Sequence, residues 1–256
     1  MSSNKYWIVD NGSAKAKSIR KQFEALIPKN WTIEDQNFEY LFVIGGDGTF
    51  LRNKALYSNK KIVAINGGNF GYYSYFNVRN IKQIFSKISN DSFFYHPLEI
   101  EITIDNQTYF CINEVLIRSD VVFKTDIYLN NQLLEFLKGS GILFASPLGS
   151  TAHAKNVGGA IINPNLAAIQ FIEIEPITQK SYSSLKSPLI LGIDTKIVLK
   201  AKDNCRAFIL LDGIKINKVF DSELIIKASY AKFKMFKPDC NQHYIKKLRE
   251  SFIRDK

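Results

Sequence analysis

The sequence predicts two domains: an α/β N-terminal domain, Rossmann-like with a parallel sheet, and a strand-rich, β-sandwich-like C-terminal domain. Two continuous apolar runs, at 40–44 and 62–65, are each followed closely by two glycines, as buried parallel strands are when their loops emerge at the carboxyl ends. Beyond residue 98, short runs alternate between apolar and polar residues, which indicates antiparallel strands. The pattern changes at His96-Pro97, and this change separates the two domains.

Strand and helix patterns alternate through the first domain, which we assign to residues 1–97. Residues 5–9 and the two apolar runs predict its strands, and 81–88 predicts a helix. Two further helices are predicted where apolar residues recur at helical spacing, at Ile19, Phe23, Leu26 and Ile27 and again at Leu51, Ala55 and Leu56. This β-α-β order favours a parallel sheet.

Period-two alternation predicts the strands of the second domain, which we assign to 98–235. Residues 99–104 and 107–112 form a predicted hairpin around an Asp105-Asn106 turn. Further short strands are predicted at 115–118, 125–129, 141–145, 169–174, 196–199, 206–211 and 223–227. In the last segment, 236–256, apolar residues at Ile245, Leu248 and Phe252 predict a helix that packs back on the first domain.

The composition excludes several classes of protein. With 256 residues, 46% hydrophobic and 23% charged, the chain is globular, and its apolar runs are far shorter than a membrane span of roughly 18 residues. The first ten residues lack the pattern of a signal peptide, so we expect a cytoplasmic protein with no membrane partner. The net charge of +10 comes from scattered lysines without a recognition motif, so we expect no nucleic-acid partner.

Patterns for protein-bound metals and for hydrolases are absent from the sequence. The three cysteines are widely spaced, which argues against both a disulfide framework and a structural zinc. The three histidines, His96, His153 and His243, are too scattered to form an evident metal set. Ser150 and His153 suggest a nucleophile and a base, but no G-x-S-x-G motif surrounds the serine. We therefore predict neither a metalloenzyme nor a hydrolase.

The first motif with chemical meaning is Gly45-Gly46-Asp47-Gly48-Thr49, directly after an apolar run. Three glycines allow the main chain to approach a phosphate, and a helix that starts at Thr49 would offer free amides. An aspartate in such a loop raises the cost of binding a polyphosphate, unless it accepts the proton of an attacking hydroxyl. An ordinary Asp-Gly turn is the alternative explanation.

Three further segments combine polar and aromatic residues. The stretch 66–73 is a second glycine loop with aromatic rings, which suit stacking on a base or packing at a domain interface. Asn113 and Glu114 interrupt an apolar run and need polar partners, for which ribose hydroxyls are suitable, although such a pair is also common in turns. Residues 146–153, with Gly158-Gly159 following, predict a Gly-Ser-Thr turn at a helix start, where hydroxyls and amides favour an anion or a polar ligand edge; a plain helix cap is the alternative.

In their order and approximate spacing, these four segments resemble the NAD kinase family. The matching pieces are GGDGT at 45–49, N-x-G-x-x-G at 66–71, NE at 113–114 and the GSTA-x(5)-GG run at 149–159. The resemblance spans nearly the entire chain. It implies transfer of the γ-phosphoryl group of ATP, or of a phosphoryl group of polyphosphate, to the 2′-hydroxyl of the adenosine ribose of NAD, which gives NADP.

The resemblance also implies roles for residues of the first, third and fourth segments. Asp47 would be the proton acceptor, and Gly48 would help to hold the phosphates. Asn113 and Glu114 would contact the adenosine end, with Glu114 also near the metal. The base pocket would be lined by Thr151 and Ala152, with His153 and Asn156 beyond them.

The chain departs from the family pattern at several positions. His153 stands where tyrosine is usual, Tyr72 where phenylalanine is usual and Phe70 where leucine is usual. Ser140 replaces an aspartate that contacts the dinucleotide, often across a subunit boundary. The resemblance further implies a phosphate contact for Lys138 and positions near the substrate for Glu175 and for Gly213 of the late Asp212-Gly213 pair.

The same resemblance implies the cofactor and partners. Mg²⁺ or another divalent cation would arrive with the phosphate donor, and the chain would form homodimers or homotetramers. Two alternatives remain open from the sequence. A GGDG loop also occurs in lipid kinases of the diacylglycerol and sphingoid type, and a non-catalytic nucleotide-binding protein would need the same phosphate loops.

Overall fold

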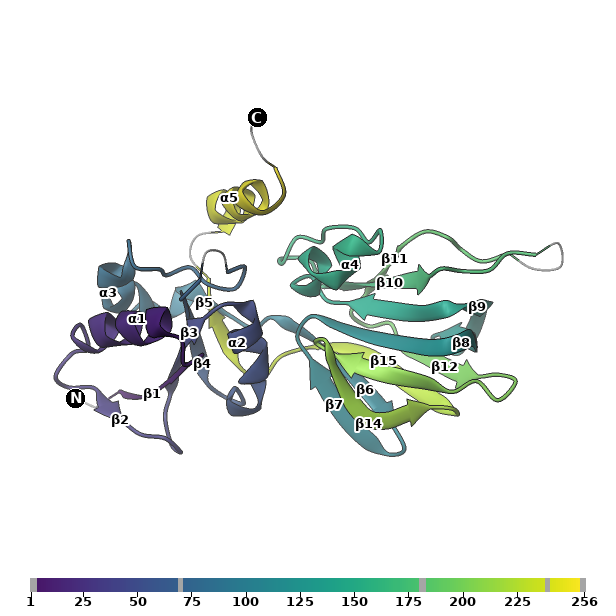
Figure 1. The fold of residues 1–256 in the computed structure, drawn as a ribbon, viewed down its shortest axis with the longest axis horizontal. Helices are drawn as coiled ribbons and strands as arrows, with labels where there is room; N and C mark the ends of the chain where they lie inside the picture. Colours follow the sequence, from purple (N-terminus) through teal and green to yellow (C-terminus); the bar gives the residue numbers. More distant parts are fainter. Residues whose placement is uncertain (1–3, 69–70, 180–182, 238–239, 254–256) are drawn as a thin grey trace. The chain divides into compact units, whose positions relative to one another are not determined.

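The computed structural model describes residues 4–68, 71–179, 183–237 and 240–253. The chain divides into two compact units (Figure 1). The N-terminal unit comprises residues 1–96 and 232–256, and the C-terminal unit comprises residues 97–231. The sequence places the second boundary at 235, whereas the structure assigns 232–235 to the N-terminal unit because a short strand there joins the N-terminal sheet.

A six-stranded sheet forms the centre of the N-terminal unit. Its order is β2-β1-β3-β4-β16-β5, and every pair except β16 with β5 is parallel. The strands are β1 (Lys5–Asp10), β2 (Thr32–Ile33), β3 (Tyr40–Gly45), β4 (Lys61–Asn66), β5 (Phe94–Tyr95) and β16 (Lys234–Phe236). All six residues of β3 are buried, as a central parallel strand requires, so the prediction for 40–44 is confirmed.

Helices cover both faces of this sheet. They are α1 (Ala14–Glu24), α2 (Asp47–Arg52), η1 (Lys54–Leu56), η2 (Ile81–Gln83), α3 (Ile84–Ile88) and η3 (Asp91–Phe93). Side chains of α1 and α3 share one core cluster with β1, β3 and β4. On the other face, the Phe50 ring of α2 stacks on Tyr73 and packs against Tyr57.

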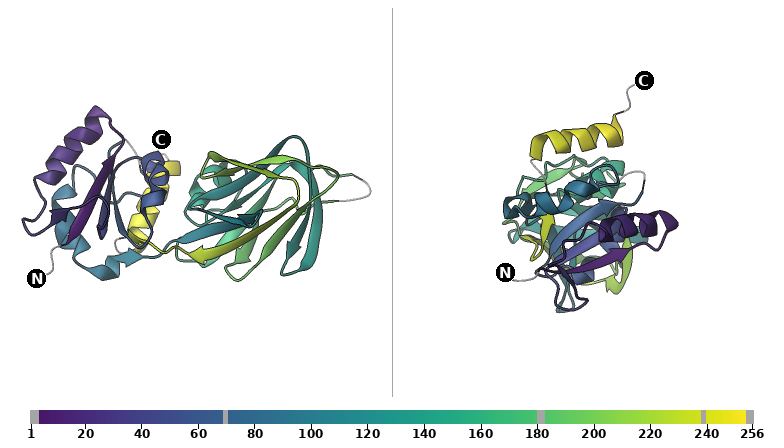
Figure 2. Two further views of the ribbon diagram at one scale, coloured as in Figure 1. Left: turned by 90° about the horizontal axis from the view of Figure 1, so that it is seen from below. Right: turned by 90° about the vertical axis from the view of Figure 1, so that its left-hand side faces the viewer.

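The C-terminal unit is built from antiparallel strands (Figures 1 and 2). The main path is β11-β10-β9-β8-β12-β15-β6-β7, and β13 pairs with β8 and β14. The strands are β6 (Leu98–Ile104), β7 (Gln107–Cys111), β8 (Glu114–Leu129), β9 (Gln132–Ala145), β10 (Ala168–Ile174), β11 (Leu189–Gly192), β12 (Ile197–Ala201), β13 (Ala207–Leu211), β14 (Ile214–Phe220) and β15 (Glu223–Tyr230). Two short helices, η4 (Gly149–Thr151) and α4 (His153–Asn156), follow β9.

The long strand β8 lets the sheet fold on itself. It pairs with β13 over 115–118 and with β12 over 125–129, and its register with β9 shifts between these two stretches. Strands on both sides of the shift contribute to one core cluster, which the two sheet halves enclose. The predicted α/β and β-sandwich-like fold classes are confirmed.

Several elements differ from the sequence prediction. The segments 115–118 and 125–129 are parts of the single strand β8, because the polar residues between them stay in extended backbone. The first helix ends before Leu26 and Ile27, which nevertheless pack on the same core. The helix after β3 starts at Asp47, not at Thr49, and Ala55 and Leu56 lie in η1.

The C-terminal helix α5 (Cys240–Phe252) agrees with the helix predicted in the segment 236–256. Its Lys247 side chain donates a hydrogen bond to the Gly71 carbonyl of the N-terminal unit. Within the described residues, no helix has the length and apolar character needed to cross a membrane.

Two carboxyl groups of the C-terminal unit share one backbone donor. The Leu185 N–H lies 3.1 Å from a Glu135 oxygen and 3.2 Å from a Glu173 oxygen, and the other Glu135 oxygen is buried without a partner. Burial and the adjacent Glu173 carboxyl raise the pKa of Glu135 to about 7. The folded state therefore favours a protonated Glu135.

This raised pKa predicts a pH-dependent stability. Because the ordinary pKa is 4.5, the stabilisation from a protonated Glu135 is complete below about pH 4.5 and is lost as the pH rises through about 7. We expect the melting temperature of the E135Q variant to fall less steeply between pH 5 and 8 than that of the wild-type chain. The exposed Glu223, which pairs with Lys200, gives the matched control E223Q. Parallel melting curves for the wild type and E135Q would contradict the assignment.

Candidate functional site

The loop after β3 places Asp47 at the carboxyl edge of the parallel sheet. Gly46 caps α2 in extended conformation, and Asp47 is the first helical residue. A side chain at Gly45 would lie within 2.4–2.9 Å of the Thr49 side chain, so this tight turn requires glycine there. Gly48 is exposed, which leaves its backbone accessible to a ligand.

Two backbone amides hold the Asp47 carboxylate. The Tyr72 N–H donates to Oδ2 at 2.9 Å, and the Tyr73 N–H donates to Oδ1 at 3.1 Å. Burial raises the pKa of Asp47 above its ordinary value of 3.8, and these two hydrogen bonds and the charge of Lys247 act in the opposite direction. A carboxylate that is fixed in orientation, with its pKa raised above the ordinary value, is suited to accept a proton.

The second glycine loop therefore acts on Asp47 through its main chain. Tyr72 is half-buried, and its N–H donates to the Asp47 carboxylate. Gly67 lies so close to Gly45 that a side chain would meet the Gly45 backbone at 3.1–3.3 Å. Phe70, which the sequence comparison singled out, lies outside the described residues.

In the C-terminal unit, Asn113 and Glu114 lie at the start of β8 and both are buried. Asp212 fixes this segment, since its Oδ1 accepts the N–H of Ile112 at 3.0 Å and that of Asn113 at 2.7 Å. Asp212 and Gly213 form the two-residue turn between β13 and β14, with φ angles of 51° and 77°. The predicted ligand contact Gly213 is exposed, whereas Asp212 contacts the Asn-Glu pair.

Glu114 has an unsatisfied oxygen. Its Oε2 atom is buried and has no hydrogen-bond partner. Burial, together with the negative charge of Asp212, raises the pKa of Glu114 to about 7. A buried carboxyl oxygen without a partner is costly, so this atom is a candidate contact for a ligand hydroxyl or a cation.

The turn at 146–151 packs directly on the Asn-Glu segment. The Ser146 N–H donates to the Asn113 carbonyl at 2.8 Å, and its hydroxyl donates to the Ile112 carbonyl at 2.5 Å. Ser150 is fully buried, donates to the Pro147 carbonyl at 2.7 Å and accepts the Ile162 N–H at 2.9 Å. Its hydroxyl therefore stabilises the turn, which agrees with the prediction that it is not a nucleophile.

The predicted base-pocket residues follow this turn. Thr151 and Ala152 are half-buried, and His153 and Asn156 are exposed on α4. The Thr151 hydroxyl donates to the Leu148 carbonyl at 3.2 Å. Thr151 and Ala152 are therefore partly buried and still partly accessible to a ligand.

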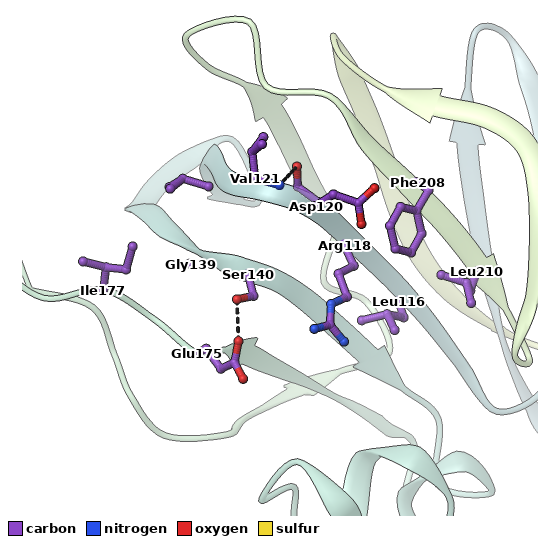
Figure 3. Close-up of a pocket in the computed structure, with 12 residues that line it drawn as sticks. Leu116, Arg118, Asp120, Val121, Gly139, Ser140, Glu175, Ile177, Phe208 and Leu210 are labelled. Carbon is purple, nitrogen blue, oxygen red and sulfur yellow. Dashed lines mark hydrogen bonds between the residues drawn. The ribbon is translucent and has the colours of Figure 1, made fainter.

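A cavity of about 710 Å³ lies in the C-terminal unit beside β8 and β9. Ser140 and Glu175 line it, and the Ser140 hydroxyl donates to the Glu175 carboxylate at 2.5 Å (Figure 3). The Arg118 guanidinium lies beside this pair in the figure. Lys138 is not among the residues that line the cavity, and its ammonium lies 5.3 Å from the centre of the Phe136 ring.

The structure thus brings the predicted residues together in three groups. Asp47, Gly48 and Tyr72 lie in the N-terminal unit, and Asn113 and Glu114 lie beside the turn that precedes Thr151. Ser140 and Glu175 share the cavity. Among the described residues, no group of three or more His, Cys, Asp and Glu side chains could hold a metal ion.

Three residues at these sites were missed as contacts by sequence reasoning: Asp212, Arg118 and Lys247. Asp212 was noted only as part of an Asp-Gly pair, because nothing in the sequence links it to Ile112. Arg118 lies at the end of an apolar run. The sequence alone does not show whether such a charged side chain faces a cavity or bulk solvent. Lys247 is one of two adjacent lysines on the C-terminal helix, and its proximity to Asp47 arises only from the tertiary fold.

Comparison with known proteins adds independent findings. Residues 10–93 match the family described as "ATP-NAD kinase N-terminal domain", and residues 112–237 match "ATP-NAD kinase C-terminal domain". The NAD kinase of Mycoplasmoides gallisepticum is 33% identical over 97% of this chain and 94% of that protein. The NAD kinase of Ureaplasma parvum is 35% identical over 86% of this chain and 83% of that protein.

Solved structures show the same fold. A yeast NADH kinase complexed with NADH superimposes with a TM-score of 0.81 at 18% identity, covering 98% of this chain and 87% of that one. An NAD kinase from Archaeoglobus fulgidus in complex with ATP gives a TM-score of 0.77 at 21% identity, covering 96% of this chain and 98% of that one. The two-domain architecture is therefore shared across distant sequences.

The close approach at Gly149 predicts a strong effect of substitution. A Cβ atom there would lie 2.1 Å from the Asn113 carbonyl oxygen and 2.4 Å from its carbon, so the backbone must move. We expect G149A to lose about 1–3 kcal/mol of stability or more, measured as a lower melting temperature. G192A on β11 is the matched control, because its new methyl group would meet no atom within 4 Å. Equal melting temperatures for the two variants would contradict this packing.

Proposed function

The chain belongs to the NAD kinase family, and we propose that it phosphorylates the 2′-hydroxyl of the adenosine ribose of NAD with ATP to give NADP. It is a phosphotransferase. The observation that supports the chemistry most directly is the Asp47 carboxylate, which is held by two backbone amides and has a raised pKa.

We propose that Asp47 accepts the proton of the attacking hydroxyl. As the ribose 2′-oxygen forms its bond to the γ-phosphorus, its proton passes to the carboxylate, and ADP leaves with the electrons of the broken P–O bond. The fixed orientation of the carboxylate lowers the entropic cost of reaching this geometry. The exposed backbone of Gly48 is free to contact phosphate oxygens, in keeping with its proposed role.

The residues of the C-terminal unit are proposed to bind the nucleotide. Glu114 Oε2, buried and unpartnered, suits a ribose hydroxyl, and Asn113 lies next to it. Thr151 and Ala152 are proposed to contact the base, with His153 and Asn156 at the exposed edge. The cavity beside Ser140 and Glu175 is proposed to take the remainder of the dinucleotide. The roles proposed for Lys138 and Gly213 rest on the resemblance alone.

A divalent cation, such as Mg²⁺, is proposed to accompany the phosphate donor. The buried Oε2 atom of Glu114 fits a cation as well as it fits a hydroxyl, because it is an orphaned carboxyl oxygen. When bound, the cation would neutralise charge on the transferring phosphoryl group. Since Glu114 has a pKa of about 7, its affinity for the cation would increase with pH.

The same site allows two other functions, which one assay separates. A lipid kinase of the GGDG type would phosphorylate a diacylglycerol or sphingoid acceptor, and a non-catalytic protein would bind nucleotides without turnover. Incubation of the purified chain with ATP, Mg²⁺ and NAD, followed by enzymatic detection of NADP, tests the proposal. Parallel reactions with polyphosphate and with NADH identify the preferred donor and acceptor.

Replacing Asp47 tests its role. We expect D47N to bind NAD nearly as well as the wild type while kcat falls by about 10²–10⁴-fold, because the amide keeps the shape but cannot accept the proton. D35N, at an exposed aspartate of the same unit, is the matched control. Calorimetric titration with NAD measures binding, and NADP formation measures turnover. Unchanged turnover in D47N would remove Asp47 from the mechanism.

We further propose that the chain acts as a homodimer or homotetramer in the cytoplasm. Val121 and Val122, which line the cavity, are 72% and 44% exposed, so a second copy would cover apolar surface there. A cytoplasmic location is in keeping with nucleotide substrates, which are charged and do not cross membranes unaided. Light scattering on an active sample should give at least twice the mass of 29.2 kDa. A monomeric mass at full activity would rule out the assembly.

A further inference from the structure

We infer that Lys247 on α5 is a positioning residue for Asp47, acting through the peptide unit that joins Gly71 to Tyr72. This inference rests on the proposed function, in which Asp47 accepts the proton. The Lys247 ammonium donates a hydrogen bond to the Gly71 carbonyl, and the Tyr72 N–H of the same peptide unit donates to Asp47.

The contacts form a continuous path. The Lys247 ammonium donates to the Gly71 carbonyl oxygen. That carbonyl and the Tyr72 N–H belong to the same peptide unit, and the N–H donates to Asp47 Oδ2 at 2.9 Å. A cation on the oxygen of a peptide polarises it, which makes its N–H a stronger donor. Lys247 therefore strengthens the hydrogen bond that orients the Asp47 carboxylate.

The charges act in the same direction as the contacts. The Lys247 charge lowers the pKa of Asp47 against the larger effect of burial, and the Asp47 charge raises that of Lys247 against its own burial. The other charged groups that act on Lys247 are Glu250 and Lys246, both on α5. Tyr72 and Tyr73 each donate a backbone N–H to the Asp47 carboxylate. Without the Lys247 charge, the neutral N–H groups of Tyr72 and Tyr73 would still lower the pKa of Asp47, but the contribution of this positive charge would be lost.

The burial of Lys247 is in keeping with this role. Lys247 is half-buried, although a lysine on a helix surface normally extends into water. Its neighbour Lys246 is exposed and pairs with Glu250 at 3.8 Å on the same helix. The two lysines therefore differ in what they contact, and they form a natural comparison.

The test compares K247M with K246M, each of which removes one positive charge from α5. For K247M we expect kcat for NADP formation to fall about 10–100-fold at neutral pH, as for a misplaced catalytic group. We also expect the acidic limb of its kcat profile to move to higher pH by about one unit, because the pKa of Asp47 rises when the opposite charge is lost. K246M should keep the wild-type rate and profile.

Two further measurements separate positioning from folding. K247R keeps the charge and should retain the position of the acidic limb, and melting curves should show both Lys247 variants folded. In the full chain, the Asp47 carboxyl carbon, assigned by its absence from the D47N spectrum, should titrate at higher pH in K247M by ¹³C NMR. This readout does not depend on turnover.

The outcomes distinguish a failure of the role inferred for Lys247 from a failure of the proposed function on which it rests. An unchanged acidic limb and an unchanged Asp47 titration in K247M overturn the inference, even if the rate falls. An equal effect in K246M also overturns it, because a general charge effect would then suffice. If the wild-type chain forms no NADP, or if D47N keeps full activity, the proposed function or the role of Asp47 fails, and the NMR titration still decides whether Lys247 stabilises the Asp47 charge.

Discussion

The arrangement of the loops in the N-terminal domain depends on the hydrogen bonds that stabilise the Asp47 carboxylate away from water. A buried carboxylate is destabilising unless its oxygens are hydrogen-bonded, and Asp47 meets this requirement with one backbone N–H for each oxygen. Both donors come from the loop after β4, and Asp47 follows β3. The two loops can meet only because β3 and β4 are parallel neighbours, which brings their carboxyl ends to one edge of the sheet. The strand direction is therefore a requirement of the site as well as of the core.

The C-terminal domain uses the same type of contact, backbone amides that hold a carboxylate, but here the carboxylate acts on a second carboxyl group. Asp212 is held by the amides of Ile112 and Asn113, so its carboxylate anchors the start of β8. Burial and the charge of Asp212 together raise the pKa of Glu114 to about 7. Asp47, by contrast, has the Lys247 charge nearby. These different surroundings are in keeping with the different tasks proposed for the two carboxyl groups, proton acceptance for Asp47 and ligand binding for Glu114.

Much of this fold is encoded locally, and the remainder is not. The apolar run at 40–44, the glycines after it and the Asp105-Asn106 turn each follow from neighbouring residues, so the sheet edge with Asp47 could be predicted. The extent of β8 could not, since the polar residues around Ser119 break the alternation while the strand continues through a register shift. The place of β16 is set by pairing with Lys61 and Ile62, which no local pattern reveals. Likewise, the Asp212 hydrogen bond to Ile112 joins residues 100 positions apart.

The departure at Ser140 illustrates how the structure changes the meaning of a substitution. Considered alone, a serine in place of an aspartate removes a negative charge from the cavity. However, the Ser140 hydroxyl donates to Glu175, which lies directly after β10 and lines the same cavity. Glu175 has a φ angle of 48°, a left-handed conformation that is unfavourable for glutamate and that persists only where its surroundings stabilise it. The cavity therefore retains a carboxylate, which Glu175 supplies from the end of the neighbouring strand β10. The Ser140 hydroxyl orients this carboxylate through its hydrogen bond.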